Sequence, residues 1–296
     1  MNILLFGCRG QVGWELQRSL AVLGQVTALD FDSADHCGDF SNPAGVADTV
    51  RTLRPDVIVN AAAHTAVDKA ESEPELARTL NATTPGALAE EAARLGATFV
   101  HYSTDYVFDG SGERPWDESD TPAPLSVYGR TKLQGEQLIA QSGAQHLILR
   151  TSWVYAARGG NFAKTMLRLA QERERLTVID DQWGAPTGAE LLADVTAHAI
   201  RHVRRQPQDA GLYHVAAAGE TTWYSYAKYV ISHASKSQKA IKIIANEVAP
   251  VATSAFPTPA ARPLNSRLNT RKLQATMGLV LPPWHAGVSR MLTEIL

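Results

Sequence analysis

The segment Gly7-Cys8-Arg9-Gly10-Gln11-Val12-Gly13 has a glycine at every third position, directly after a short apolar run and before a helical pattern. Glycine has no Cβ, so the backbone can turn tightly there and approach a phosphate, and free amides at the helix start attract negative charge. A bare glycine triplet is also typical of an ordinary strand-to-helix turn. Its place between a first strand and a first helix favours a dinucleotide-binding loop, with Gly7, Gly10 and Gly13 as cofactor-binding residues.

The chain alternates short apolar runs with longer amphipathic stretches, which is typical of parallel strands joined by crossover helices. We predict one helix from about Gln11 to Leu23 and another after Ser41-Asn42-Pro43, where a capping residue precedes proline. Strands are predicted at Asn2–Gly7, Val26–Asp30, Asp56–Ala62, Thr98–Ser103, His146–Thr151 and Leu176–Ile179. The expected fold is therefore α/β, a Rossmann-type doubly wound parallel sheet.

After about Thr151 the alternation becomes less regular, which indicates a second unit. We predict a dinucleotide-binding domain over residues 1–150. Residues 151–296 are expected to form mainly a smaller substrate-binding domain, with some segments returning to the sheet. The segment Ala249–Arg262 is rich in Pro, Ala and Thr and is expected to be an ordered loop that crosses a surface or covers a site.

Asp30 ends the second predicted strand, 23 residues after Gly7. A carboxylate at this place accepts hydrogen bonds from the ribose hydroxyls of adenosine, which favours NADH. Arg9 within the glycine loop is a candidate partner for the 2′-phosphate of NADPH. The sequence leaves the choice between NADH and NADPH open.

Two tyrosine–lysine pairs have the same spacing of four residues, Tyr128 with Lys132 and Tyr224 with Lys228. This spacing puts both side chains on one helix face. An ammonium near a phenol lowers the pKa of the tyrosine and lets it act as a general acid. Only the first pair follows a hydroxyl-bearing strand end, residues 102–105, and ligands of open parallel sheets bind at such ends. We therefore predict the first pair as catalytic and the second as part of a surface helix.

Charge and composition argue against several classes of function. The chain has 28 Lys and Arg against 30 Asp and Glu, so no overall field attracts it to nucleic acid or to an anionic membrane. It has no apolar stretch long enough for a membrane helix and no secretory signal pattern. Its two cysteines, Cys8 and Cys37, are too few for a disulfide framework. We expect a cytoplasmic protein.

The glycine loop, the strand end Asn60-Ala61-Ala62-Ala63-His64-Thr65 and the first tyrosine–lysine pair resemble the extended short-chain dehydrogenase/reductase family. Longer segments narrow this resemblance to its dTDP-4-dehydrorhamnose reductase branch. These segments are YSTDYVFDG at 102–110, RTSWVY at 150–155, DQWGAPT at 181–187 and RPLNS at 262–266. The likeness extends from Asn2 to about Leu292, nearly the whole chain.

The resemblance implies reduction of the C4 ketone of dTDP-4-dehydro-L-rhamnose to dTDP-L-rhamnose, for rhamnose-containing cell-surface polysaccharide, with NADH or NADPH. Tyr128 would protonate the carbonyl oxygen, and Lys132 would hold the ribose and lower the pKa of the tyrosine. Thr104 would polarise the carbonyl, a role that serine has in many members. Asp105 and Trp153 would contact the sugar. Further positions that match cofactor contacts are Gly10, Gln11, Val12, Asp30, Asp39, Phe40, Ala63, His64, Thr65 and Tyr102.

Some of these residues also have a purely structural interpretation. His64 could equally be a histidine at the edge of the core that bonds the backbone instead of contacting a cofactor. Trp153 could be a packing residue, because aromatic residues in strands usually fill the core. The resemblance also implies a homodimer with a magnesium ion at its interface, on Glu15, Glu190 and Glu294. Each of these glutamates is typical of an ordinary helix surface as well.

Two other functions compete with reduction. A nucleotide-sugar epimerase or dehydratase shares the fold and the tyrosine–lysine pair. Dehydratases have a glutamate beside the aspartate, whereas this chain has Tyr106 next to Asp105, which favours reduction. The second alternative is a non-catalytic, dinucleotide-binding regulatory subunit. Relatives of that kind can lose the tyrosine or the lysine, and this chain has both.

Overall fold

A six-stranded parallel sheet is the centre of the computed structural model, which describes residues 1–237 and 241–296. The strand order is β10-β5-β4-β3-β1-β2. The strands are β1 (Asn2–Phe6), β2 (Gln25–Leu29), β3 (Val57–Asn60), β4 (Thr98–Thr104), β5 (Gln145–Thr151) and β10 (Gly211–His214). The chain goes from β1 to β2 at one edge and then returns to β3 on the other side of β1. The strand order therefore reverses between β1 and β3, and ligands of such sheets bind beside the carboxyl ends at that point.

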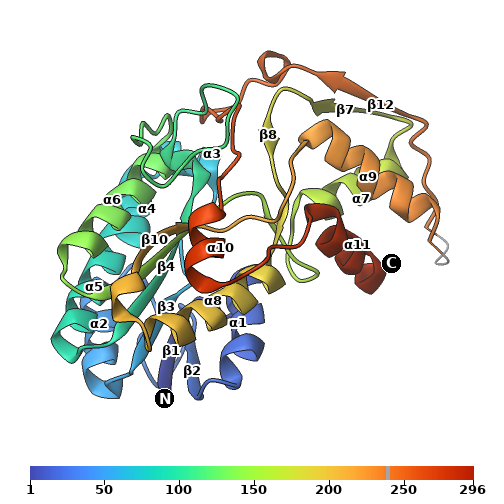
Figure 1. Cartoon of the computed structure of the whole chain (residues 1–296). Coiled ribbons are helices and arrows are strands. Elements are labelled where there is room, and N and C mark those ends of the chain that lie inside the picture. The colour runs from blue at the N-terminus through green and yellow to red at the C-terminus, as the bar shows by residue number, and fades with distance from the viewer. Residues whose placement is uncertain (238–240) are drawn as a thin grey trace.

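Helices cover both faces of the sheet because its strands are apolar on both sides (Figure 1). Ile3 and Leu5 point to a core shared with α1 and α8, whereas Leu4 and Phe6 point to a core shared with α2 and α5. The first layer contains α1 (Gln11–Ala21), α8 (Ala189–Val203) and α10 (Arg271–Met277). The second contains α2 (Pro43–Leu53), α5 (Thr84–Leu95) and α6 (Val127–Gln141).

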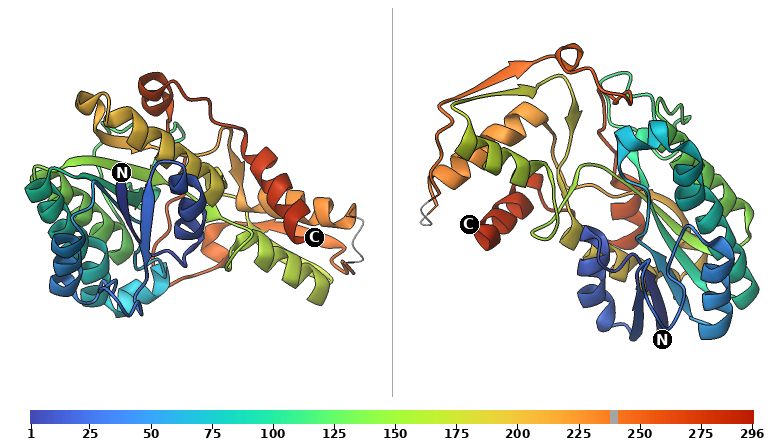
Figure 2. Two further views of the ribbon diagram at one scale, coloured as in Figure 1. Left: turned by 90° about the horizontal axis from the view of Figure 1, so that it is seen from below. Right: turned by 180° about the vertical axis from the view of Figure 1, so that it is seen from behind.

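A second body lies beside the sheet, as both views in Figure 2 show. It has its own hydrophobic core. Its main elements are α7 (Phe162–Glu172), α9 (Trp223–Ser235), α11 (Trp284–Ile295) and the parallel pair of β7 (Arg175–Ile179) and β12 (Glu247–Val251). Two further small pairs are β6 (Val154–Tyr155) with β9 (Thr187–Gly188) and β8 (Trp183–Gly184) with β11 (Thr221–Thr222). Shorter helical segments are α3 (Val67–Ser72), α4 (Pro74–Arg78), the π-helix η1 (Thr79–Thr83), η2 (Asp105–Val107), η3 (Pro207–Asp209) and η4 (Thr253–Ala255).

The structure confirms the predicted α/β sheet and corrects two of its details. The predicted strand at 176–179 forms, but it pairs with β12 outside the main sheet. The sixth strand of the sheet is instead β10, which is only four residues long and has no distinctive pattern. The segment 249–262 also begins as strand, since β12 extends to Val251 and the loop follows it. The predicted start of α2 is confirmed, with the Asn42 side chain accepting a hydrogen bond from the Gly45 amide at 3.0 Å.

Segments of the second half of the chain return to the sheet. Helices α8 and α10 pack on one of its faces and β10 forms one of its edges. None of the helices in the described ranges has the length and apolar character that a membrane span requires.

Candidate active site

A cavity of about 670 Å³ lies at the carboxyl ends of β1, β3, β4 and β5, where the strand order reverses. Its wall brings together the glycine loop, the ends of β2 to β5 and the start of α6. The lining residues are Gly7, Gly10, Gln11, Val12, Asp30, Phe31, Gly38, Asp39, Phe40, Ala61, Ala62, Ala63, Thr65, Val67, Leu80, Tyr102, Ser103, Thr104, Asp105, Tyr106, Tyr128, Lys132, Thr151, Ser152, Trp153 and Val154. Segments far apart in the sequence therefore share one binding space.

The glycine loop has the geometry that a pyrophosphate requires. Gly7 has a φ of 76°, and a Cβ there would lie 2.6 Å from the amide nitrogen of Ala62. A Cβ at Gly13 would lie 2.0 Å from the carbonyl oxygen of Gly7, so α1 begins directly on the loop. Among the described residues, no side chain caps the first turn of this helix. Its first amides are therefore available to an anion, and the residues present fit a dinucleotide.

Asp30 lies at the edge of the cavity and is held by backbone amides. Its two carboxylate oxygens accept hydrogen bonds from the amides of Arg9, at 2.9 Å, and Phe31, at 3.0 Å. The guanidinium of Arg9 pairs with Asp32 at 2.8 Å, and both side chains are exposed. The carboxylate that favours NADH and the cation that favours NADPH therefore lie at the same edge of the site.

Tyr128 enters the cavity from the first turn of α6. The Ser126 side chain caps this helix by accepting a hydrogen bond from the Gly129 amide at 3.1 Å. Burial raises the pKa of Tyr128 to about 12, and the neighbouring Thr104 hydroxyl opposes this shift. The expected lowering of this pKa by Lys132 is therefore wrong for the chain alone, because burial outweighs the other effects. Tyr128 is a neutral phenol at pH 7 and so carries a proton that it can donate.

Lys132 lies one helical turn after Tyr128, and its side chain is only 2% exposed. Its Nζ donates a hydrogen bond to the carbonyl oxygen of Tyr102 at 2.6 Å and lies 3.1 Å from Nε2 of His101. Burial lowers the pKa of Lys132 to about 8, and the charge of Glu136 opposes this shift. Glu136 itself is bound by two hydrogen bonds to Arg150, at 2.8 and 2.6 Å.

The ends of β4 and β5 supply the polar floor of the cavity. The Thr104 hydroxyl donates to a carboxylate oxygen of Asp105 at 3.1 Å, and burial raises the pKa of Asp105 to about 6. Among the described residues, four buried oxygen atoms in the wall have no hydrogen-bond partner. They belong to Ser103, Asp105, Thr151 and Ser152. Buried polar atoms are normally hydrogen-bonded, so this floor fits a ligand with several polar groups.

Trp153 lines the cavity in a left-handed conformation, with a φ of 49°. Its ring stacks on Trp223, the first residue of α9, at 3.6 Å between ring centroids. The Nε1 of Trp223 donates in turn to the side chain of Gln182 at 3.0 Å. The conformation of Trp153 is therefore supported by the second body of the molecule.

The family model described as the RmlD substrate binding domain matches residues 1–296. The dTDP-4-dehydrorhamnose reductases of Escherichia coli K12 and Salmonella typhimurium LT2 are 63% and 64% identical to the chain over 295 residues. Each match covers 100% of this chain and 98% of the relative. The chain belongs to the dTDP-4-dehydrorhamnose reductase family.

Solved structures agree with this family. A dTDP-4-dehydrorhamnose reductase from Clostridium acetobutylicum matches with a TM-score of 0.89 and 34% identity, covering 100% of this chain and 99% of that one. The Bacillus anthracis dTDP-4-dehydrorhamnose reductase, solved in complex with NADP, matches with a TM-score of 0.88, 34% identity and the same coverage. The UDP-glucose 4-epimerase of Thermus thermophilus has a TM-score of 0.77 at 19% identity, covering 100% of each chain, and shows the shared fold alone.

Most residues predicted for the reductase site lie in the wall of the cavity, but two do not. Gly13 packs under the loop. His64 is buried beside the wall, where its amide donates to the Asn81 side chain at 2.8 Å. The same Asn81, in the π-helix η1, donates to the Thr131 hydroxyl at 3.1 Å. It therefore joins the segment around His64 to α6.

Sequence reasoning missed several residues of the wall. Thr151 and Ser152 directly follow the buried part of β5, so the strand-end rule that selected Thr104 and Asp105 applies to them equally. Four others carry no comparable motif, because they belong to turns and short helices: Phe31, Gly38, Val67 and Leu80. Three more lie inside the family segments but have apolar side chains without a chemical signal of their own: Ala61, Ala62 and Val154.

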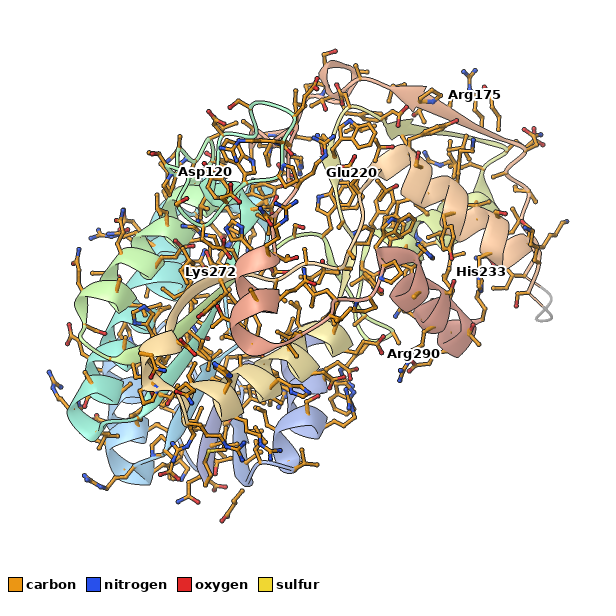
Figure 3. The ribbon with its side chains drawn as sticks, viewed as in Figure 1. Asp120, Arg175, Glu220, His233, Lys272 and Arg290 are labelled. Atoms are coloured by element: carbon orange, nitrogen blue, oxygen red, sulfur yellow. The ribbon has the colours of Figure 1, made fainter. Side chains whose placement is uncertain are left out.

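The three glutamates predicted for magnesium come from α1, α8 and α11. Burial raises the pKa of Glu190; Arg290 opposes this shift, and the charges of Glu15 and Glu294 add to it. Arg290 extends from α11 (Figure 3). Its guanidinium pairs with Glu190 at 3.4 Å. Within residues 1–237 and 241–296, no three acidic, histidine or cysteine side chains are placed to hold a metal ion. The magnesium site stays a prediction, since a single chain does not assemble it.

Proposed function

We propose that this chain reduces the C4 ketone of dTDP-4-dehydro-L-rhamnose to dTDP-L-rhamnose with NADH or NADPH. The observation that carries the proposal is that Tyr128 and Thr104 line one cavity together with the glycine loop. The curated relatives above are named for this reaction, and the matches span almost their full length.

Tyr128 is the proposed proton donor to the ketone oxygen. Its phenol keeps its proton at pH 7 because burial disfavours the phenolate. The carbonyl oxygen becomes a strong base only as the carbonyl carbon is reduced, and at that point it takes the phenolic proton. The Thr104 hydroxyl has a single proton, which Asp105 accepts in the chain alone. With the sugar bound, that proton would turn to the ketone oxygen and polarise it.

The glycine loop and its neighbours are the proposed dinucleotide site. Gly7, Gly10, Gln11 and Val12 would hold the pyrophosphate on the first turn of α1, and Asp30 would accept bonds from the ribose. Asp39, Phe40, Ala63, Thr65 and Tyr102 are the further proposed contacts. When bound, the reduced nicotinamide supplies the hydride. Lys132 holds the neighbouring ribose in this proposal, and its ammonium is the form that can donate to ribose oxygens.

The sugar would lie between the end of β4 and the Trp153 ring. Asp105 and the unpaired hydroxyls of Thr151 and Ser152 offer hydrogen bonds to sugar hydroxyls. Trp153 offers an apolar face on the other side. A hydroxylated ring with one apolar face matches this combination of surfaces.

The test is loss of the absorbance of NADH or NADPH on mixing with enzymatically prepared dTDP-4-dehydro-L-rhamnose, with product identification by mass and sugar analysis. Oxidation that depends on the sugar and yields dTDP-L-rhamnose is the expected result. A changed sugar without net oxidation would instead indicate an epimerase. If neither sugar nor cofactor changes while the dinucleotide binds, the regulatory-subunit alternative replaces the proposal.

We also propose a homodimer in which carboxylates of two chains complete a magnesium site around Glu15, Glu190 and Glu294. Hard divalent ions need six or more oxygen ligands, and the described part of one chain provides no preformed set. Sedimentation before and after EDTA treatment tests this arrangement. A dimer that becomes monomeric with EDTA and re-forms with Mg²⁺ is expected, and an unchanged sedimentation coefficient would contradict the metal.

A further inference from the structure

A buried chain of three polar side chains runs behind the cavity from β3 through β4 to α6. Asn60 and His101 are aligned partners in the β3–β4 register, and Nδ2 of Asn60 lies 3.0 Å from Nδ1 of His101. The other imidazole nitrogen, Nε2, lies 3.1 Å from Nζ of Lys132. His101 is 1% exposed and does not line the cavity.

The hydrogen bonds of Asn60 fix the direction of this chain. Its Oδ1 accepts a hydrogen bond from the Ala62 amide at 2.8 Å, so the side-chain nitrogen of Asn60 points to His101. An amide nitrogen only donates, and therefore Nδ1 of His101 has to accept. The proton of the neutral imidazole then resides on Nε2, which faces Lys132.

This tautomer conflicts with a charged lysine. An ammonium has only donors, so the Nε2–H group of His101 would face another donor across 3.1 Å. A neutral amine has a lone pair, which accepts from Nε2–H while one of its own N–H groups donates to the carbonyl oxygen of Tyr102. His101 and Lys132 can therefore form a hydrogen bond, with one donor and one acceptor, only when Lys132 has lost a proton.

We propose that His101, held in the Nε2–H form by Asn60, is a positioning residue that makes the ammonium form of Lys132 less stable and thereby sets the upper pH limit of the reaction. His101 touches neither the proposed sugar position nor the cavity and acts through Lys132. The inference rests on the proposed function, since it assigns Lys132 a role in that reaction.

Other charged and titratable groups around Lys132 do not produce this effect. On α6, Glu136 favours the ammonium, but Arg150 of β5 binds both of its oxygens. Tyr128 on the same helix is neutral near pH 7, because burial raises its pKa. Asp105 after β4 has a pKa of about 6 and is mostly ionised at pH 7, and a carboxylate would favour the ammonium rather than oppose it. The imidazole of His101 itself stays uncharged, since burial and Lys132 both lower its pKa.

Imidazole nitrogen resonances test the tautomer without any enzyme assay. A long-range ¹H–¹⁵N spectrum of the ¹⁵N-labelled full chain at pH 7 separates protonated from unprotonated ring nitrogens. The His101 signals are identified by their absence in His101→Gln. We expect an unprotonated Nδ1 and a protonated Nε2. The opposite pattern would overturn the proposal.

The pH profile of kcat/KM tests the consequence. In His101→Gln the side-chain oxygen can accept from the ammonium of Lys132, so the alkaline limb is expected to move up by about one pH unit. His214→Gln is the matched control, because His214 is equally buried on β10 and bonds the Trp116 carbonyl instead. An unchanged profile in His101→Gln, or a shift to lower pH, would contradict the proposal.

Asn60→Asp provides a second variant in case His101→Gln does not fold. An aspartate can still accept from the Ala62 amide and would also accept from Nδ1–H, which forces the proton away from Nε2. The alkaline limb should again move up, and the ring-nitrogen pattern should reverse. If wild-type protein oxidises no cofactor with this sugar, the proposed function fails, whereas the spectra and the pH dependence of NADH binding still decide the role of His101.

Discussion

Helices α6 and α9 begin in the same way, with a tyrosine and a lysine four residues apart, yet the two pairs have different surroundings. Lys132 is buried and bonds the Tyr102 carbonyl, while Tyr128 faces the cavity. Lys228 is exposed, and its ammonium lies 5.1 Å from the centroid of the Tyr224 ring as a cation–π pair. In the second pair the two side chains contact each other. In the first pair Lys132 binds the Tyr102 carbonyl, and Tyr128 lines the cavity.

The difference comes from what each helix packs against. The first turn of α6 meets the end of β4, where Thr104 supplies a hydroxyl, and the sheet excludes water from the lysine. Helix α9 packs against α7 and α11 in the second body. It contributes to the cavity through Trp223, which supports Trp153, rather than through its tyrosine and lysine. Spacing alone therefore does not define a catalytic pair; a strand end and burial do.

Replacing the proposed acid tests the first pair most strongly. Tyr128→Phe should lower kcat by about 10² to 10⁴-fold, because the variant lacks the only proposed proton donor to the ketone oxygen. NADH binding, followed by fluorescence, should stay close to the wild-type value. Near-normal turnover in this variant would show that another group donates the proton.

Removing the buried ammonium should affect both binding and rate. Lys132→Met is expected to weaken NADH binding and lower kcat, each by about 10 to 100-fold, since charge-assisted hydrogen bonds are lost. In wild type, NADH binding should weaken as the pH rises above about 8, because Lys132 is charged below its pKa and neutral above it. Titrations of NADH between pH 6 and 10 measure both effects. Lower turnover with unchanged NADH affinity would mean that the ribose contact is misassigned.

The role of α9 can be tested through its first residue. Trp223→Ala removes the stack that supports Trp153 and should raise the KM for the sugar about threefold to tenfold, with little change in NADH affinity. Trp183→Ala is the control, because Trp183 is a partly exposed tryptophan that packs against Arg267 rather than Trp153. If both substitutions raised the KM for the sugar equally, the stack of Trp223 on Trp153 would have no specific role in sugar binding.

The same contrast explains which parts of the site the sequence predicts. The glycine loop, the end of β4 and the start of α6 are contiguous segments whose local chemistry is complete. Gly7, Thr104 and Tyr128 can therefore be selected from the sequence, and all three line the cavity. The short strand β10 and the support of Trp153 by Trp223 depend on contacts between distant segments. The pKa of Tyr128 also depends on burial in the folded chain, and for that reason its direction was predicted wrongly.

The smallest effect is expected for the second pair itself. Tyr224→Phe and Lys228→Met should leave kcat, KM and NADH affinity unchanged, because neither residue lines the cavity. Lys228→Met loses an exposed cation–π contact and should lower the free energy of unfolding by no more than about 1 kcal/mol. Urea unfolding together with the NADH assay measures both quantities. A tenfold loss of activity in either variant would show that Tyr224 or Lys228 contributes to the reaction. Burial at a strand end would then not be the property that distinguishes a catalytic tyrosine–lysine pair from a structural one.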